Sequence, residues 1–199
     1  MSEGWLQLTS GGGYDFDTRA IFGPFTPRRD IAHPLSLLAR FVGHTSVPWS
    51  VASHSICVAL TIRDVKFGDN GVGAGLMHDA HEAVIGDIPT PLGRALGPVM
   101  KIIKCEIQNA IHEELEITPS RWPSSFADWI HSADSAALLV EKQMLMLPEP
   151  RDWGVTSPGQ EWLLAYHDNF CKLVADRQTF GQGAEDAFMW VYDEYVENR

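Results

Sequence analysis

The chain has 199 residues, of which 45% are hydrophobic and 21% are charged, so it suits one folded domain with a sizeable core. Its formal net charge of −11 argues against a general nucleic-acid binder, because phosphate binding favours a basic face, but it leaves room for a small anionic substrate. The first residues lack the pattern of a signal peptide and no apolar run is long enough for a bilayer, so we expect a cytoplasmic protein that does not contact a membrane.

Residues 1–29 contain several turn-forming residues and show no helical periodicity. Short strands such as Trp5–Leu8, joined by tight turns, are compatible with this composition. The glycine triplet at 11–13 is not followed by Lys-Ser/Thr, so it indicates a flexible turn rather than a phosphate-binding loop. We therefore expect a small irregular or β-hairpin segment at the N-terminus.

An apolar stripe at helical spacing predicts a helix from Asp30 to Gly43, with Asp30 as its cap. This stripe consists of Ile31, Leu35, Leu38 and Val42. Arg40 and Phe41 would then lie in the last turn of that helix. A second helix is expected at about 48–63 and carries His54 beside its apolar face.

The small apolar residues of 72–84 predict a helix of the kind found at the centre of a bundle, and 89–98 reads as a loop. Further helices are expected at about 99–115, 125–147, 159–177 and 184–196. No repeat, linker or composition shift suggests a second domain. The prediction is a single all-α domain over 1–199, with an N-terminal segment at 1–29, a catalytic helical core at 30–147 and C-terminal helices at 159–199.

Three cysteines, Cys57, Cys105 and Cys171, are widely spaced and odd in number. They predict neither a disulfide framework nor a cysteine zinc site. We expect all three to be reduced residues of the core.

One stretch gathers polar residues inside an apolar helix. His78, Asp79 and Glu82 would converge, because helical residues three and four apart share a face, and Asp87 would join them from the turn at Gly86. Buried carboxylates and imidazoles are costly unless they are paired or bind a metal.

His54, His78, Asp79 and Asp134 all sit beside apolar neighbours and can be grouped as ligands. Imidazole nitrogens combined with carboxylate oxygens suit Zn²⁺, Co²⁺ or Mn²⁺. Taken singly, His54 would be a core histidine and Asp134 the partner of an arginine. Taken together with Glu82, these readings would leave several unpaired polar groups in one apolar core, so we favour a metal site.

These residues resemble the H…HD…D signature of the HD-domain phosphohydrolases. The resemblance extends to Arg40-Phe41 and to the segments 51–55, 78–82 and 86–91, which are similar to the 5′-deoxyribonucleotidase branch and to the phage dATP triphosphohydrolases. The segments Trp5–Asp17 and 30–33 are similar to small phage and bacterial proteins of this group. The similarity covers about Trp5–Leu147 and implies the HD-domain helical bundle as the fold.

The resemblance also implies roles for the polar residues. One divalent transition metal would be held by His54, His78, Asp79 and Asp134, and a triphosphate substrate would bring Mg²⁺ with it. Glu82 would orient or deprotonate the attacking water. Asp87 would hydrogen-bond a 3′-hydroxyl or protonate the leaving 5′-oxygen, two alternatives that the sequence leaves open.

The implied substrate site adds Arg40 for the phosphate, together with Phe41, Asp79 and Asp87. Ile88, Pro89 and Thr90 would line it with their backbone. Phe41 stands where the nucleotidase branch often has tryptophan.

The implied activity is hydrolysis of the 5′-phosphates of a deoxyribonucleotide, with dATP and its lower phosphates as the first candidate. The alternatives are a 5′-deoxyribonucleotidase acting on dNMPs and a non-catalytic nucleotide-binding regulator. A cyclic-nucleotide or (p)ppGpp hydrolase fits the short chain and the 86–91 block less well. By resemblance the protein self-associates, which apolar residues of the C-terminal helices would allow, and a phage-encoded copy would act in the host cytoplasm. These residues are Phe188, Trp190, Val191 and Tyr195.

Overall fold

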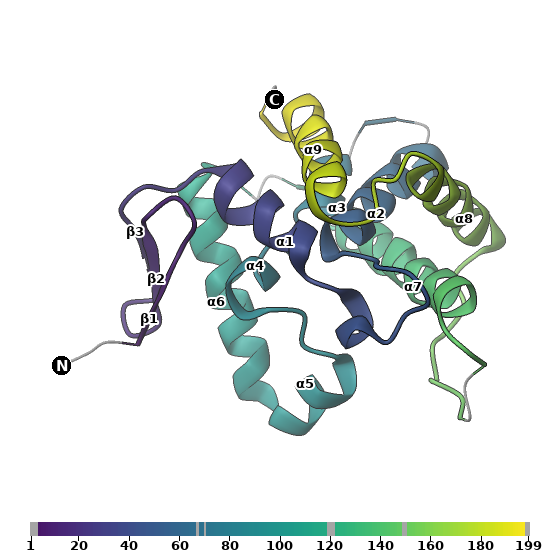
Figure 1. Ribbon diagram of the computed structural model, residues 1–199, viewed down its shortest axis with the longest axis horizontal. Coiled ribbons are helices and arrows are strands. Elements are labelled where there is room, and N and C mark those ends of the chain that lie inside the picture. The colour runs from purple at the N-terminus through teal and green to yellow at the C-terminus, as the bar shows by residue number, and fades with distance from the viewer. Residues whose placement is uncertain (1–3, 67, 70, 119–121, 149–150, 198–199) are drawn as a thin grey trace.

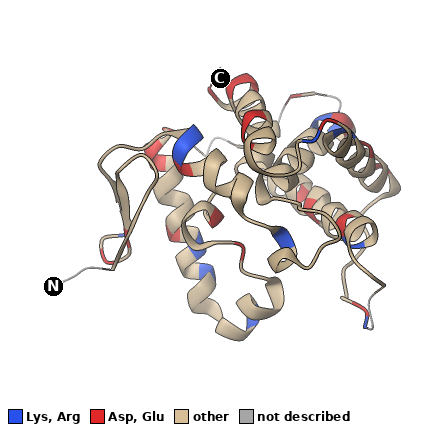
Figure 2. Ribbon diagram, in the orientation of Figure 1, with Lys and Arg blue, Asp and Glu red and all other residues tan. Residues whose placement is uncertain are grey.

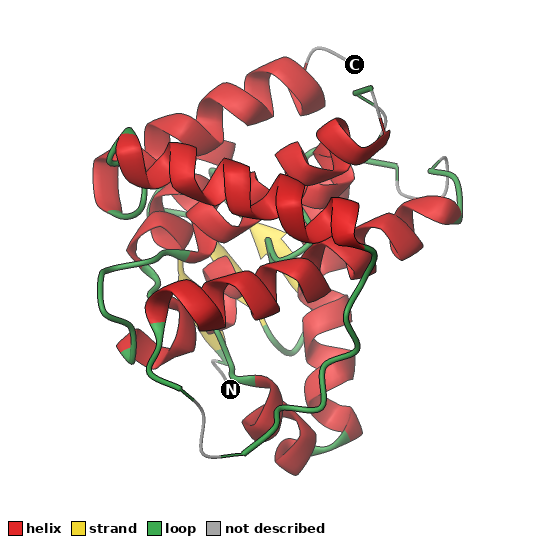
Figure 3. Cartoon of the chain, turned by 90° about the vertical axis from the view of Figure 1, so that its right-hand side faces the viewer, coloured by secondary structure: helices red, strands yellow, loops and turns green. Residues whose placement is uncertain are grey.

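The computed structural model describes residues 4–66, 68–69, 71–118, 122–148 and 151–197. Helices make up most of this described chain, and the strands form one small patch (Figure 3). The predicted fold class, a helical bundle with a small N-terminal β-segment, is confirmed. Figure 1 places that segment at one edge of the molecule, beside α6 and away from α8.

The N-terminal segment is a three-stranded antiparallel sheet in the order β1-β2-β3. Its strands are β1 Trp5–Gln7, β2 Gly13–Asp15 and β3 Ala20–Phe22. Gly13 pairs with Phe22, and a Cβ on Gly13 would collide with the rings of Phe22 and Trp5. The glycine triplet is therefore only partly a turn, because Gly13 belongs to the central strand.

Asp30 ties this sheet to the first helices. Its Oδ1 accepts the backbone N–H of Ser10 at 2.9 Å, and its Oδ2 accepts that of Thr26 at 2.6 Å. Asp30 is buried inside the π-helix η1 Arg28–Ala32. It therefore connects the N-terminal segment to η1 by hydrogen bonds and is not the predicted helix cap.

The predicted helix 30–43 is wrong beyond its middle. After η1 the chain forms α1 His33–Leu37 and then becomes extended at Leu38. The Leu38 carbonyl accepts the N–H of Val51, so this segment pairs with the chain just before α2 instead of continuing the helix.

Arg40 and Phe41 therefore lie in a short 3-10 segment, η2 Arg40–Gly43. Phe41 and Val42 both adopt left-handed backbone conformations, with φ of 55° and 54°. Val42 was predicted to face the core but is 64% exposed. Left-handed backbone at two neighbouring bulky residues is strained and is found most often at functional sites.

The centre of the bundle is α2 Val51–Lys66, rather than the predicted helix 72–84. It contacts α3, α7, α8 and α9, and its first nine residues are all buried. The close approach of α3 depends on Gly75, where a Cβ would lie 2.7 Å from Ile62 Cδ1 and 3.1 Å from Ala59 Cα.

The stretch 72–84 is not one helix, contrary to the prediction. It divides into α3 Val72–Leu76 and α4 Glu82–Ile85, with turns between them. Within those turns the N–H of Ala80 bonds the Met77 carbonyl, and the N–H of Glu82 bonds the Asp79 carbonyl. These tighter bonds end the α-helical ladder just where the His-Asp pair occurs.

The remaining predicted helices are present with shifted ends: α6 Pro98–Glu114, α7 Ser125–Leu145, α8 Gln160–Ala175 and α9 Gly181–Tyr192, which the π-helix η4 Asp193–Glu197 extends. The predicted loop 89–98 instead contains α5 Thr90–Leu96, whose second residue, Pro91, suits a first helical turn.

Two predictions of burial need correction. Cys57 is buried, but Cys105 and Cys171 are exposed, because only one face of each of their helices meets the core. On α9, Phe188 and Val191 are buried within the bundle, so only Trp190, at 58% exposure, presents a large apolar side chain there.

Figure 2 shows Lys and Arg dispersed among several elements and interspersed with Asp and Glu. Within the described chain, no helix combines the length and the apolar composition needed to cross a bilayer.

Candidate metal centre

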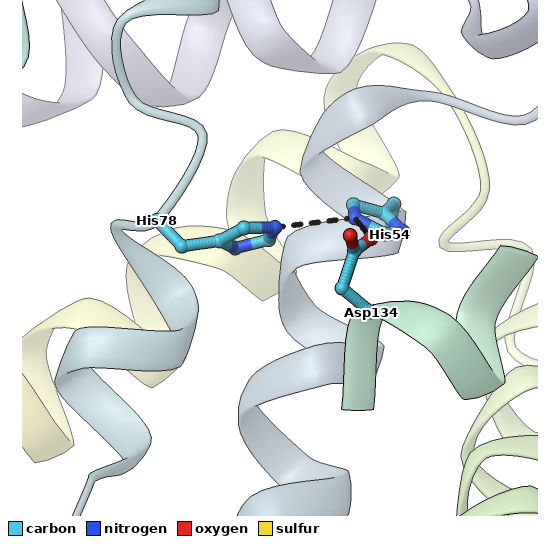
Figure 4. Close-up of side chains that lie close together, drawn as sticks. All are labelled: His54, His78 and Asp134. Atoms are coloured by element: carbon cyan, nitrogen blue, oxygen red, sulfur yellow. Dashed lines mark hydrogen bonds and ion pairs between the residues drawn. The ribbon is translucent and has the colours of Figure 1, made fainter. Parts of the chain in front are cut away.

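Four predicted ligands meet at one point, although they come from three parts of the chain. His54 lies on α2, Asp134 lies on α7, and His78 and Asp79 lie in the turns between α3 and α4. His54 Nε2 is 3.4 Å from His78 Nε2 and 3.4 Å from Asp134 Oδ1 (Figure 4). Asp79 Oδ2 lies 3.1 Å from His78 Nε2 and 3.7 Å from His54 Nε2.

These separations suit ligands of a single ion. Atoms bound to one metal at 2.0–2.2 Å lie about 3–4 Å apart in tetrahedral or octahedral geometry. The atoms of His54, His78 and Asp134 lie within 4.8 Å of one another, and Asp79 stands against both imidazoles. The structure thus contains a possible metal site with the residues that the sequence grouped.

Hydrogen bonds at the Nδ1 atoms orient both imidazole rings. His54 Nδ1 donates to Glu141 Oε1 at 3.1 Å, and His78 Nδ1 donates to the Gly75 carbonyl at 2.7 Å. Each Nε2 is therefore the atom turned towards the cluster. Fixing the tautomer in this way is typical of metal-binding histidines.

Glu141 is the main residue that the sequence reasoning missed. It is fully buried, and its Oε1 also accepts hydrogen bonds from Trp49 Nε1 at 2.7 Å and from Tyr166 Oη at 2.6 Å. Its Oε2 accepts from Arg40 Nε at 2.8 Å. A signal was available, because Glu141 follows Asp134 by two helical turns and so shares its face.

The electrostatics of this network favour the ionised carboxylate. Burial alone would raise the pKa of Glu141, but the charge of Arg40 and the neighbouring His54 lower that pKa to about 2. Burial likewise disfavours the charged form of His78, yet the adjacent Asp79 raises the pKa of His78 to about 9. The cluster therefore favours positive charge at its centre, as a cation site requires.

Glu82 lies next to the cluster but outside it. Its side chain is almost fully buried, and its Oε2 has no hydrogen-bond partner among the described residues. The other oxygen, Oε1, is 3.6 Å from Lys104 Nζ. Burial and the charges of Asp79 and Asp87 raise the pKa of Glu82 to about 9.

Asp87 follows α4 after Gly86, whose φ of 80° turns the chain. Burial raises the pKa of the Asp87 carboxyl, and the charges of Arg40 and His54 act against that shift. Asp87 thus shares the electrostatic environment of the cluster. The assignment of Ile88, Pro89 and Thr90 to the substrate stays a prediction.

Arg40 is largely buried and pairs with Glu141, and it is not part of a surface ion pair. Its side chain is 11% exposed, and its Nε is bonded to Glu141. The guanidinium carbon lies 5.3 Å from the centre of the Phe41 ring, which in turn lies 6.0 Å from the ring of Trp153. Arg40 therefore connects Glu141, which holds His54, to the aromatic side chains of Phe41 and Trp153.

Two named proteins are similar to this chain. Uncharacterized protein YfdR of Escherichia coli K12 is 37% identical over 128 residues, which cover 63% of this chain and 65% of YfdR, just under two thirds. Uncharacterized protein RCAP_rcc00048 of Rhodobacter capsulatus is 29% identical over 153 residues, or 73% of this chain and 74% of that protein. No protein-family model matches the sequence.

The chain is a helical homologue of both proteins. Their names assign no activity. Its buried His/Asp cluster is consistent with the HD-domain resemblance.

Proposed function

We propose that the protein is an HD-domain phosphohydrolase that uses one divalent ion to hydrolyse the 5′-phosphates of deoxyribonucleotides. The observation that carries this proposal is the convergence of His54 Nε2, His78 Nε2, Asp79 Oδ2 and Asp134 Oδ1. This donor set suits Co²⁺, Zn²⁺ or Mn²⁺. A divalent ion held there would supply Lewis-acid charge that activates water and neutralises phosphoryl oxygens.

The open side of the cluster supports a catalytic rather than a structural site. The side chain of Asp134 is 48% exposed, whereas that of His54 is fully buried. We propose that a substrate phosphate approaches from this exposed side, next to α7. Closed structural zinc sites are usually built with cysteine ligands, and none of the four residues of this cluster is a cysteine.

Glu82 has the properties of a general base in this proposal. Its unpartnered Oε2 is available to accept a proton from the attacking water. The raised pKa reflects a strongly basic carboxylate, and cationic charge beside Asp79 would bring that pKa down towards neutrality.

Arg40 and Asp87 are proposed to contact the substrate. The Nε of Arg40 is committed to Glu141, so the phosphate contact is proposed for its terminal nitrogens. Asp87, whose carboxyl is held towards its protonated form by burial, would hydrogen-bond the 3′-hydroxyl or protonate the leaving 5′-oxygen. Phe41 is proposed as a sugar or base contact.

The first candidate substrate is dATP, on the strength of the N-terminal resemblance to phage proteins. The test incubates the purified protein with Co²⁺ or Mn²⁺ and a panel of dNMPs, dNTPs and NTPs, and identifies products by chromatography. Release of deoxyadenosine from dATP supports the triphosphohydrolase, whereas phosphate release from dNMPs alone supports the 5′-deoxyribonucleotidase. No product from any nucleotide would refute the enzyme proposal.

A non-catalytic nucleotide-binding regulator is the competing function. Glu82→Ala separates the two, with exposed Glu113→Ala as a matched control. Catalysis predicts that E82A loses turnover by at least about 100-fold while an ion stays bound at His54 and His78. An unchanged rate would remove Glu82 from the mechanism.

We also propose that the protein self-associates and acts in the cytoplasm. Apolar side chains on α5 and the start of α6 are half exposed or more, and they offer a surface for a second copy. These side chains are Leu92, Leu96, Val99 and Ile102. Light scattering should give a mass above that of one chain, and Val99→Glu should reduce it.

A further inference from the structure

A second group of potential ligands lies beside the first. Single atoms of Asp79, His81 and Glu82 lie within 4.8 Å of one another. His81 and Glu82 are only 7% and 4% exposed. Neither His81 Nε2 nor Glu82 Oε2 has a hydrogen-bond partner among the described residues. Leaving a buried polar atom unpaired is costly, so the two atoms point to a missing partner.

The hydrogen bonds behind His81 determine which of its nitrogens carries the proton. The Met77 carbonyl can only accept, so the atom of Gln108 that contacts it at 2.8 Å is the donor Nε2. Gln108 Oε1 is then the atom facing His81, where it accepts the backbone N–H at 3.1 Å and the Nδ1–H at 3.2 Å.

Because Nδ1 holds the proton, His81 Nε2 presents a lone pair to the interior. This is the arrangement of a metal-binding histidine, whose second nitrogen donates to a carbonyl oxygen. His112 accepts the other N–H of Gln108 at 2.8 Å, so the amide is held on both sides. Met77, Gln108 and His112 thus fix the direction in which His81 points.

Asp79 belongs to both groups of ligands. Its Oδ2 faces His54 and His78, and a carboxylate has a second oxygen for another ion. Glu82 adds a second carboxylate, and its closest cationic neighbour, Lys104 at 3.6 Å, lies beyond hydrogen-bond distance. One neutral imidazole and two carboxylates are a donor set for Mn²⁺, Co²⁺ or Zn²⁺.

We propose that Asp79, His81 and Glu82 bind a second divalent cation, with Asp79 bridging it to the ion held by His54, His78 and Asp134. Ligands of one ion at 2.0–2.2 Å can be at most about 4.4 Å apart, so side-chain movements of roughly 1 Å would complete the site. Bridged ions of this kind lie about 3.5–4 Å apart.

A second cation would also affect the choice of substrate, and this part of the inference rests on the proposed function. One oxygen of Glu82 would hold the ion while the other stays available to the attacking water. The ion would lie towards α6 and would add positive charge for a further phosphoryl group. The second site therefore favours a polyphosphate over a monophosphate.

The test counts ions instead of measuring activity. The full-length protein, freed of metal, is titrated with Mn²⁺ while the free ion is followed by electron paramagnetic resonance. We expect two ions per chain and a spin-coupled signal from the bridged pair. His81→Ala should bind one ion and lose the coupling, with at least about a 100-fold weaker second site. His131→Ala, which removes an exposed histidine of α7, should still bind two.

Several results would overturn the second site: one ion per chain at saturation in the unmodified protein, two uncoupled ions, or two ions in H81A. The count in the unmodified protein decides even if H81A does not fold. His54→Ala should keep one ion, which separates the two sites. Two coupled ions without hydrolysis of any nucleotide would refute the proposed function and leave the second site standing, whereas one ion with hydrolysis would do the reverse.

Discussion

Replacing Glu141 with Gln tests whether the buried carboxylate organises the metal centre. Three donors converge on its Oε1 and Arg40 Nε on its Oε2. Gln keeps the size but turns one acceptor position into an NH₂ group that must face another donor. Breaking a buried ion pair by removing one partner costs about 3–5 kcal/mol. The loss of support for His54 should also weaken Co²⁺ binding by about 10–100-fold.

The measurements are urea denaturation of the metal-free protein and a Co²⁺ titration. Glu185→Gln is the matched control, because Glu185 is also a buried carboxylate but pairs with the half-exposed Arg28 and with His33. That control should lose about 1 kcal/mol or less and keep its metal affinity. If E141Q unfolds within about 1 kcal/mol of the unmodified protein and binds Co²⁺ within about twofold, the reasoning about Glu141 is wrong.

Three further predictions concern the same region. Acid should destabilise the metal-free protein, because the Glu141 carboxyl has a pKa of about 2 when folded against 4.5 for a free glutamate. Its contribution of about 3 kcal/mol to the free energy of unfolding is present above pH 4.5 and lost as the pH falls through 2, and E141Q should lack this loss in urea denaturation. Gly75→Ala should cost about 1–3 kcal/mol by pushing α3 from α2, whereas Gly93→Ala, with open space around it in α5, should unfold at the same or higher urea. Chelation should lower the thermal midpoint reversibly in the unmodified protein, and differential scanning fluorimetry should show a smaller shift for H54A.

The arrangement of helices was largely readable from the sequence. The helices α2, α6, α7, α8 and α9 follow apolar periodicities that run for several turns, and each is present with shifted ends. The failures occur where tertiary hydrogen bonds override the local pattern. Leu38 leaves the predicted helix because its carbonyl pairs with the N–H of Val51, a contact that no local pattern encodes.

The four candidate metal ligands could be predicted from the sequence for a different reason. His54, His78, Asp79 and Asp134 are polar residues at positions whose neighbours are apolar, and this pattern predicted their grouping, although only His54 is fully buried and the Asp134 side chain is 48% exposed. Gln108 and Lys104 could not be found in this way, because α6 carries many polar residues and only the fold places these two against Met77, His81 and Glu82.

The break between α3 and α4 explains how one short stretch can serve two groups of ligands. In a continuous helix adjacent residues point about 100° apart, so His78 and Asp79 would lie on either side of the position of Glu82. The turns bring His78 Nε2 and Asp79 Oδ2 to 3.1 Å of each other, facing His54 on α2. They also carry His81 round to Gln108 on α6. The departure from helical periodicity therefore lets one stretch present His78 and Asp79 to α2 and His81 to α6.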